Sequence, residues 1–179
     1  MLQRDRHPSF RPPGRARAEV GAPSLLEFFD AKLPTPFAVL GIRTSGELVT
    51  RIEYLPRGVA TLAPVNRLAA RVCRQLERYL DDPEFKFDLP YEFNGTAFQQ
   101  RVWRAICAIP SGSTLTYLDI ARELKSAPRP VGGACGANRI PLVIPCHRVV
   151  ASHGIGGFMN ARGGAPIAIK QWLLRHESA

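Results

Sequence analysis

Residues 116–138, TYLDIARELKSAPRPVGGACGAN, decide the fold expected for the second half of the chain. Thr116, followed three residues later by Asp119, forms a capping pattern that starts a short helix. The segment KSAPRP interrupts that helix, and Pro130 suits the first position of another because that position needs no backbone N–H. The next segment, VGGACGAN, consists largely of small residues with poor helix propensity. Helix, turn and small-residue helix together predict a helix-turn-helix.

Two further helices are expected, one on each side of this motif. Residues 96–109, TAFQQRVWRAICAI, start with Thr96 and have Gln99 three residues later, which is a capping box. The apolar face of this helix consists of Phe98, Val102, Ala105, Ile106 and Ile109. Residues 166–177, PIAIKQWLLRHE, form the last expected helix. One side of it carries Ile169, Trp172, Leu173 and His176.

The first half of the chain has a different pattern. Residues 37–55, FAVLGIRTSGELVTRIEYL, contain two β-rich runs around Ser45 and Gly46, which is a hairpin signal. An amphipathic helix over roughly 64–81 is predicted by the recurrence of Leu68, Val72, Leu76 and Leu80. We therefore expect a flexible basic tail over residues 1–34, a small α/β domain over 35–88 and a second domain over 89–179.

Composition narrows the class of protein. The 179 residues carry a net charge of +9, which favours an anionic partner, most simply nucleic acid, over a charge that only keeps the protein dispersed. No apolar segment resembles a signal peptide or a membrane span. The four cysteines match neither a paired zinc motif nor a dense disulfide framework. These features predict a cytoplasmic protein with reduced cysteines and no membrane partner.

PLVIPCHRVV, residues 141–150, places Cys146 beside His147 at the end of an apolar run. A thiolate is the reactive form of cysteine, and a nearby base or positive field is needed to generate it. His147 could be that base, and Glu177 on the last helix could orient it in a triad-like relay. A Cys-His pair at a strand end is more often structural, so the surrounding sequence has to decide its meaning.

IPCHRVV resembles the active-site motif of the O6-alkylguanine-DNA alkyltransferases, also called methylated-DNA–protein-cysteine methyltransferases. GTAFQQRVW, IPSGSTLTY, RPVGGACGAN and KQWLLRHE resemble further blocks of that family, in its order and at about its spacing. These blocks cover residues 95–177, whereas residues 35–88 are similar only in pattern. The resemblance implies an α/β N-terminal domain, ribonuclease H-like, and a mainly α C-terminal domain that is winged-helix-like and contains the helix-turn-helix.

The resemblance assigns catalytic roles to five residues. Cys146 is implied as the alkyl acceptor, with His147 deprotonating it through a water and Glu177 orienting His147. Asn138 would hold the active-site turn by hydrogen bonds. Tyr117 would contact the phosphate next to an extruded base and help to protonate the leaving guanine.

Binding roles are implied in the same way. Arg129 would enter the base stack in place of the extruded nucleotide, and the small helix would lie in the minor groove. The other implied DNA contacts are Tyr117, Gln99, Ser152, Gly132, Gly133 and Ala134. The implied substrate pocket includes Val149, Phe158 and Met159, with the backbone near Cys146 reading the base edges.

The function so implied is direct-reversal DNA repair. One alkyl group would pass from O6 of guanine, or O4 of thymine, in double-stranded DNA to Cys146, once per protein molecule. Extruding the damaged base gives the sulfur access to it. We expect a monomer with no cofactor and no metal. Two alternatives remain: a non-catalytic lesion binder, which Cys146 argues against, and a cysteine hydrolase using Cys146, His147 and Glu177.

Three features depart from the family pattern. The turn between Tyr117 and Arg129 is about two residues shorter. Arg139 stands where a proline commonly follows the asparagine. The stretch from Phe158 to Trp172 is about five residues longer, and we expect it to form a mobile wall of the alkyl pocket with room for groups larger than methyl.

Overall fold

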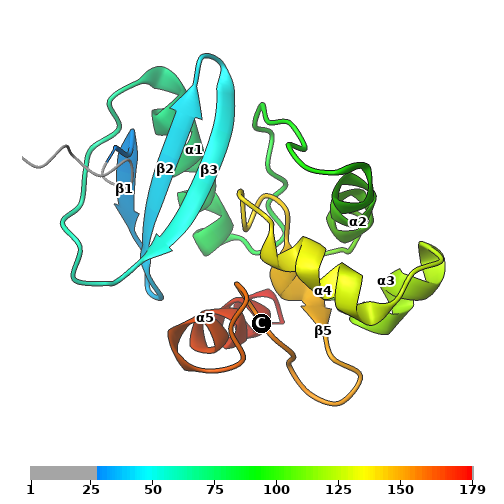
Figure 1. Cartoon of the computed structure of the whole chain (residues 1–179). Coiled ribbons are helices and arrows are strands. Elements are labelled where there is room, and N and C mark those ends of the chain that lie inside the picture. The colour runs from blue at the N-terminus through cyan, green and yellow to red at the C-terminus, as the bar shows by residue number, and fades with distance from the viewer. Residues whose placement is uncertain (1–27, 179) are drawn as a thin grey trace, which may run out of the picture.

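A computed structural model describes residues 28–178 of the chain. Its first half is a three-stranded antiparallel sheet in the order β1-β2-β3, formed by β1 (Ala31–Pro34), β2 (Val39–Ser45) and β3 (Leu48–Leu55). Helix α1 (Arg67–Asp81) packs across one face of the sheet (Figure 1). Gly46 has a φ of 56° in the turn between β2 and β3, so the expected hairpin is confirmed.

Strand β1 corrects the expected boundary of the tail. Residues 31–34 were assigned to the flexible segment, yet they pair with β2, and Phe29 and Ala31 are buried. The strand is only four residues long and ends at Pro34, so it leaves almost no periodic signal in the sequence. The expectation for residues 1–27 lies outside the described residues.

Helix α1 begins three residues later than expected. Asn66 is its N-cap, and the Asn66 Oδ1 atom accepts a hydrogen bond of 2.8 Å from the backbone N–H of Ala69. Capping by an asparagine side chain satisfies a backbone donor that the helix cannot pair internally. The cap therefore sets the start of the helix at Arg67 rather than near residue 64.

The second half is mainly helical. It contains α2 (Ala97–Cys107), α3 (Tyr117–Glu123), α4 (Pro128–Gly136) and α5 (Gly164–Glu177), together with a 3₁₀ turn, η1 (Cys146–Arg148). Two short strands, β4 (Leu115–Thr116) and β5 (Val149–Val150), pair in parallel beside these helices. Both predicted capping boxes, at Thr96 and Thr116, are present.

Helices α3 and α4 are separated by a four-residue turn, as the helix-turn-helix prediction requires. The first position of α4 is Pro128, however, and not Pro130. Small residues let α4 approach its neighbours closely, and the indole N–H of Trp103 on α2 donates to the carbonyl of Ala134 at 2.9 Å. Poor helix propensity is therefore offset by tertiary packing against α2 and α3.

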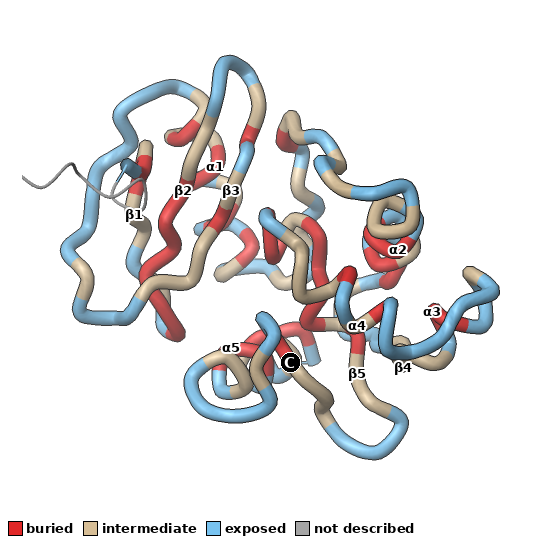
Figure 2. The backbone as a smooth tube through the Cα atoms, in the orientation of Figure 1, coloured by how far each residue is buried: buried red, intermediate tan, exposed pale blue. Residues whose placement is uncertain are grey.

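The sheet and the helices meet along β3. The backbone N–H of Val49 donates to Pro90 O at 2.8 Å, and that of Ile52 donates to Arg139 O at 2.9 Å. Buried residues run from the sheet through this junction into α2, α4 and α5 (Figure 2). Within residues 28–178, no helix is both long and apolar enough to cross a membrane.

The seam between α2 and α4 is expected to carry much of the stability of the helical half. Ile106, on α2, is completely buried. Ile106→Ala should lower the free energy of unfolding by about 2–5 kcal/mol, and the matched Ile106→Val change by about 0.5–1.5 kcal/mol. Urea denaturation of the three proteins measures both values. Equal stability of all three would contradict a close-packed seam.

Candidate active site

Cys146 is held in a turn that Asn138 organises. The Asn138 Nδ2 atom donates to Ile144 O at 2.8 Å and to Cys146 Sγ at 3.2 Å, and Asn138 Oδ1 accepts from the N–H of Ile140 at 3.0 Å. The N–H of Cys146 itself donates to Ile144 O at 2.8 Å. The three hydrogen bonds of Asn138 hold the sulfur near the end of α4. They form with arginine, and not the proline common in the family pattern, at position 139.

His147 has its tautomer set by Glu177. The His147 Nε2 atom lies 2.8 Å from Glu177 Oε1, and both side chains are buried. Because an ionised carboxylate can only accept, Nε2 carries the proton and Nδ1 presents a lone pair. Nδ1 is buried and has no hydrogen-bond partner among residues 28–178. His147 is therefore built as a base whose free nitrogen is Nδ1.

Glu177 gathers three further hydrogen bonds. Arg148 grips it in bidentate fashion, with Nε donating to Oε2 and Nη2 to Oε1, both at 2.9 Å. Tyr79, on α1, donates its hydroxyl to Oε1 at 2.7 Å. The third arm of Arg148 donates to Ile109 O at 2.6 Å. The carboxylate therefore connects α1, η1 and α5, and Arg148 extends the network to Ile109, two residues after the end of α2.

These contacts set the charge states. Burial would raise the pKa of Glu177, but the hydrogen bonds from His147 and Arg148 outweigh it and lower that pKa to about 2. Burial lowers the pKa of His147, although Glu177 opposes this effect, so the imidazole is neutral near pH 7. Burial raises the pKa of Cys146, and the Asn138 hydrogen bond opposes it. The resting group is a thiol, and its proton has to be removed before it can attack.

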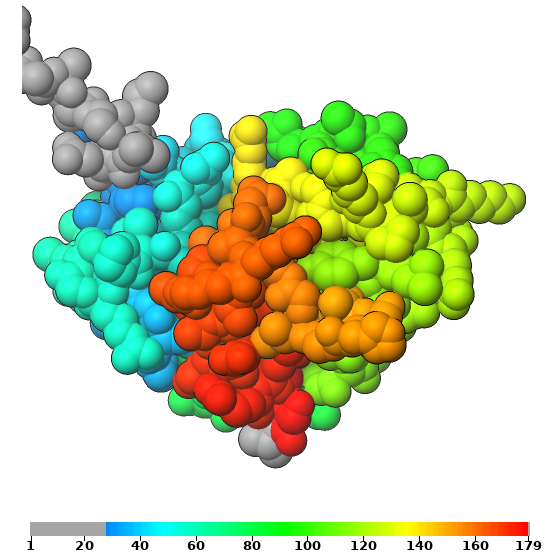
Figure 3. Space-filling view, turned by 60° about the horizontal axis from the view of Figure 1, so that its bottom comes forward, coloured from blue at the N-terminus to red at the C-terminus, as the bar shows by residue number. Residues whose placement is uncertain are grey.

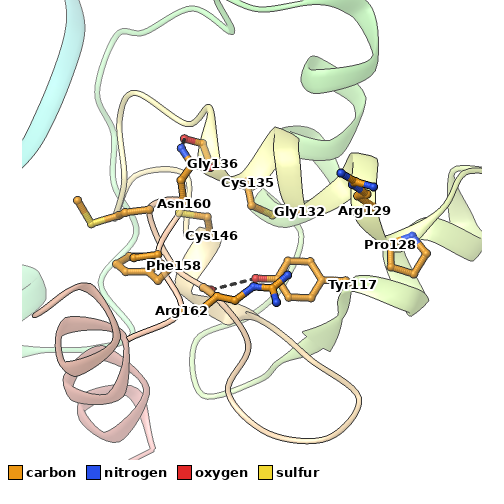
Figure 4. A pocket seen from close by; sticks show the side chains of 13 residues that line it. Tyr117, Pro128, Arg129, Gly132, Cys135, Gly136, Cys146, Phe158, Asn160 and Arg162 are labelled. Carbon is orange, nitrogen blue, oxygen red and sulfur yellow. Dashed lines mark hydrogen bonds between the residues drawn. The ribbon is translucent and has the colours of Figure 1, made fainter. Parts of the chain in front are cut away.

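Cys146 borders a cavity of about 560 Å³ between α4 and the segment that precedes α5. Figure 4 shows the residues that border it, with Tyr117 and Arg129 on the side away from Phe158. Tyr117 donates its hydroxyl to Gly157 O at 3.0 Å, and burial raises the pKa of Tyr117 to about 12. Arg129 is exposed at the border of the cavity. In this structure the cavity, which we call the front cavity, brings the thiol, a phenol and an exposed cation together.

Comparisons with known proteins identify the family of the chain. A sequence profile described as 6-O-methylguanine DNA methyltransferase, DNA binding domain, matches residues 97–179. A methylated-DNA–protein-cysteine methyltransferase of Metallosphaera sedula is 31% identical over 146 residues, which cover 81% of this chain and 90% of that protein. The chain belongs to the methylated-DNA–protein-cysteine methyltransferase family.

Solved structures of this methyltransferase family have the same arrangement of a small sheet and several helices. The O6-methylguanine methyltransferase of Mycobacterium tuberculosis matches with a TM-score of 0.69 and 31% identity, covering 82% of this chain and 90% of that chain. A structure of the same organism's OGT in complex with DNA matches with a TM-score of 0.70 and 32% identity, covering 82% and 91% of the two chains.

Some curated relatives in the methyltransferase family match over less of their length. The chain is 43% identical to the regulatory protein ada of Salmonella typhimurium and covers 51% of itself and 26% of that protein. It is 41% identical to the inducible methyltransferase of Bacillus subtilis and covers 50% of each. The match to the methyltransferase of Archaeoglobus fulgidus covers 58% of that protein. The chain thus spans 26% to 58% of these three relatives.

Most residues expected from the methyltransferase pattern gather around Cys146. Asn138, His147 and Glu177 form the hydrogen-bonded groups described above. Six others line the front cavity or lie close beside it: Tyr117, Arg129, Gly132, Phe158 and Met159 line it, and Gly133 follows Gly132 on α4. Ser152 is exposed on the loop that follows β5.

Three residues that were expected to contact DNA or to line the substrate pocket lie outside the front cavity. Ala134 is buried against α2, so its side chain packs in the core and cannot touch DNA. Val149 is also fully buried and is not among the residues that line the front cavity. Its carbonyl accepts a hydrogen bond of 2.6 Å from the Lys170 ammonium. Gln99 uses its Oε1 atom to cap the N–H of Thr96 at 2.9 Å and lies outside this cavity.

Sequence reasoning missed Arg148, Tyr79 and Lys170. Lys170 is buried, donates to Val149 O and, at 3.0 Å, to Gly157 O, and has a pKa lowered by burial to about 8. Its position seven residues before Glu177 puts both on one face of α5, which was the available signal. Tyr79 gave no signal, because only the fold brings α1 beside α5.

The structure contains no candidate metal centre within residues 28–178, since no group of three or more His, Cys, Asp or Glu side chains lies together there. The one buried cluster of charged groups in that range is internally paired, with Arg148 and His147 both on Glu177. The described site therefore offers a thiol and a base but no metal-ligand set.

The buried carboxylate predicts a pH-dependent stability. The pKa of Glu177 is about 2 in the folded protein and about 4.3 in an unfolded chain, so its contribution is complete above pH 5 and is lost between pH 5 and 2. Glu177→Gln should therefore lower the free energy of unfolding by about 3 kcal/mol at pH 7 and by about half as much at pH 3. Denaturation at both pH values, with exposed Glu47→Gln as the control, measures this.

A Glu177→Gln deficit that is the same at pH 7 and pH 3 would mean that the glutamine disrupts packing and that the charge contributes nothing. A deficit of similar size in Glu47→Gln would mean that net charge, and not the buried ion pair, governs acid stability. We expect the stability difference between the wild type and Glu177→Gln to be smaller at pH 3 than at pH 7. Glu47→Gln should differ from the wild type at neither pH.

Proposed function

We propose that the protein repairs O6-alkylguanine in double-stranded DNA by transferring the alkyl group to Cys146. The observation that carries the proposal is the position of the Cys146 sulfur, which borders a cavity of about 560 Å³. Asn138 holds the sulfur, and the next residue, His147, is a neutral histidine bonded to the Glu177 carboxylate. Membership of the family, and the solved complex of the Mycobacterium tuberculosis relative with DNA, support the same reaction and the same partner.

The proposed DNA-binding face is formed by α3, α4 and the loop before α5. Exposed basic side chains on these elements, on the turn between α3 and α4 and on adjacent α2 include Arg101, Arg122, Lys125, Arg129 and Arg162. Cations on such a face neutralise phosphates without reading sequence, which suits a protein that inspects any sequence. Gly132 and Gly133 allow a close approach of α4 to the duplex, and Ser152 would reach a phosphate.

The chemical step is an in-line displacement. The Cys146 thiol gives its proton to His147 Nδ1 through a bridging water, and the sulfur attacks the alkyl carbon. A sulfur–carbon bond forms, the carbon–O6 bond breaks, and the electron pair leaves with guanine. The leaving guanine takes a proton from Tyr117, which is restored from solvent. Glu177 stabilises the imidazolium that His147 becomes, and it does not change its own protonation state.

The product of this step is a thioether, and it blocks the site. A thioether on Cys146 has no leaving group comparable to guanine. Asn138, His147 and Tyr117 supply a hydrogen-bond donor, a base and an acid, and none of them is placed to attack the sulfur-bound carbon. Each protein molecule should therefore act once.

We further propose a fold for each domain, a second substrate atom, a cellular location and an oligomeric state. The sheet with α1 supports a ribonuclease H-like first domain, extended from residue 35 back to include β1, and the β4–β5 pair beside α3 and α4 supports a winged-helix-like second domain from residue 89. O4 of thymine is a second proposed substrate atom, and we expect a cytoplasmic monomer that needs no cofactor.

The acceptor assignment predicts a stoichiometric reaction. With O6-methylguanine DNA in tenfold excess, repair should stop near one methyl group per protein, and intact mass should show one added methyl on the peptide that contains Cys146. Cys146→Ala should bind the same DNA and accept nothing. A linear time course over many turnovers would favour the hydrolase alternative, and methyl on Cys73, Cys107 or Cys135 would overturn the assignment.

Arg129 is expected to act only on duplex DNA. It lies exposed at the border of the front cavity, where it can fill the space left by an extruded base. Arg129→Ala should slow transfer from duplex DNA about tenfold or more, while reaction with O6-benzylguanine as a free base changes little, because no base has to be held out there. Arg122→Ala, on the same face, is the control for lost charge. Equal losses on both substrates would indicate a structural role for Arg129.

A further inference from the structure

A second thiol borders the front cavity. Cys135, on the last turn of α4, lines this cavity together with Cys146. The same two cysteines line a neighbouring cavity of about 470 Å³, which lies between β3, the end of α4 and Met159. The other cysteines of the chain, Cys73 and Cys107, line neither cavity. Cys135 and Cys146 therefore share two open spaces, and the repair step proposed above makes no use of the Cys135 thiol.

The end of α4 places Cys135 beside the turn that holds the acceptor. Residues three apart on a helix lie on the same face, with about 5–6 Å between their Cβ atoms. Cys135 and Asn138 are such a pair, because the helical turn continues to Asn138, whose N–H donates to Cys135 O at 3.3 Å. The side chain of Asn138 donates to Cys146 Sγ at 3.2 Å. Cys135 is therefore one helical turn away from the side chain that holds the acceptor sulfur.

One ammonium group acts on both thiols. Lys170 is buried, and its Nζ atom donates at 3.0 Å to the carbonyl of Gly157, which borders the front cavity with the two cysteines. Burial raises the pKa of Cys135 and that of Cys146, and the positive charge of Lys170 opposes this effect at both. A cation near a thiol favours the thiolate, which is the reactive form. Each thiol therefore ionises more readily than burial alone would allow.

The shared cavity lies between α4 and the segment that precedes α5. In the space-filling view this orange segment lies against yellow α4 (Figure 3). Phe158 and Ala161 exchange two backbone hydrogen bonds of 2.9 Å, so the segment forms a small closed turn, where the sequence predicted a loose wall. Figure 4 shows Cys135 and Cys146 on the border of the cavity. Its volume of about 560 Å³ is many times the roughly 30 Å³ that a water molecule occupies, so hydrogen peroxide fits inside.

A neighbouring thiol changes the outcome of cysteine oxidation. Peroxide oxidises a thiolate to a sulfenic acid and is itself reduced to water. A second thiol, called the resolving thiol, can then attack the sulfenic sulfur, which forms a disulfide and releases water. Without a resolving thiol, further peroxide converts the sulfenic acid into sulfinic and sulfonic acids, and thiol reductants do not reverse these products. The presence of Cys135 therefore bears on whether oxidation of Cys146 is reversible.

We propose that Cys135 is the resolving thiol of Cys146, and that peroxide converts the pair reversibly into a Cys135–Cys146 disulfide. Peroxide oxidises the Cys146 sulfur to a sulfenic acid and leaves as water. The Cys135 sulfur loses its proton and attacks the Cys146 sulfur, and the hydroxyl group leaves with that proton as a second water. In sum, two thiols and one peroxide give one disulfide and two waters. The disulfide has no free acceptor thiol, so alkyl transfer stops until a thiol reductant restores both cysteines.

Digestion with trypsin makes this linkage directly measurable. Trypsin cuts after basic residues but spares Arg129, which precedes a proline, so Cys135 and Cys146 fall on separate peptides of residues 126–139 and 140–148. Neither peptide contains another cysteine. The full-length protein is treated with hydrogen peroxide, its remaining thiols are blocked with N-ethylmaleimide, and the digest is analysed by mass spectrometry. We expect these two peptides to appear as a linked pair that dithiothreitol separates.

Cys135→Ser distinguishes a resolving thiol from one that is merely nearby. Methyl transfer from O6-methylguanine DNA is measured after peroxide and then dithiothreitol, relative to the untreated sample of the same variant. The wild type should recover most of its activity, whereas Cys135→Ser should recover about fivefold less, because its peptide 140–148 gains two or three oxygen atoms. Cys107→Ser, which removes an exposed thiol outside both cavities, is the matched control and should recover like the wild type.

Three outcomes would overturn the proposal. The first is a wild type that gives no linked pair after peroxide, whether its thiols stay free or gain oxygen. The second is a disulfide that joins Cys146 to Cys73 or Cys107 instead of Cys135. The third is equal recovery of the wild type and Cys135→Ser. The peptide measurement needs no DNA, so a protein that forms the linked pair but never accepts a methyl group would contradict the repair function and not the disulfide.

Discussion

The buried carboxylate of Glu177 is the constraint on which the rest of the site depends. It accepts hydrogen bonds from His147, Arg148 and Tyr79, and these come from a 3₁₀ turn and a helix in the two halves of the chain. An ionised carboxylate without those donors would be too costly to bury, so the donors have to be placed together. The same contacts leave one nitrogen of His147 as a free base. Folding therefore satisfies the buried carboxylate and positions the His147 base through the same contacts.

Much of the helical half could be predicted from the sequence, because its signals are local. Capping boxes at Thr96 and Thr116 and the small-residue segment after Pro128 gave the order and type of α2, α3 and α4. The sequence predictions were wrong where the structure of a segment depends on a contact with residues distant along the chain. Strand β1 is held by its pairing with β2, and Ala134 is buried in the core, where the Trp103 indole bonds to its carbonyl.

The same distinction applies to the site. Cys146, His147, Asn138 and Glu177 were expected from motifs, and the structure shows two hydrogen-bonded pairs among them, Asn138 with Cys146 and His147 with Glu177. Tyr79 and Arg148 complete the same network, but the partner of Tyr79 is 98 positions away and no periodicity indicates it. The hydrogen bond from Asn160 Nδ2 to Gly136 O was equally hidden, because it needs both the turn with positive φ at Met159 and Asn160 and a glycine opposite.

The two tryptophans of the chain lie on different seams of the molecule. Trp103 is buried under α4 with its indole N–H bonded to that helix, while Trp172 lies between Phe37, 4.6 Å away, and His176, stacked at 4.9 Å. Emission from a protein that retains only Trp103 would therefore follow the packing of α2 against α4. Emission from one that retains only Trp172 would follow the contact between the sheet and α5. Intrinsic fluorescence can thus resolve which half of the molecule loosens first.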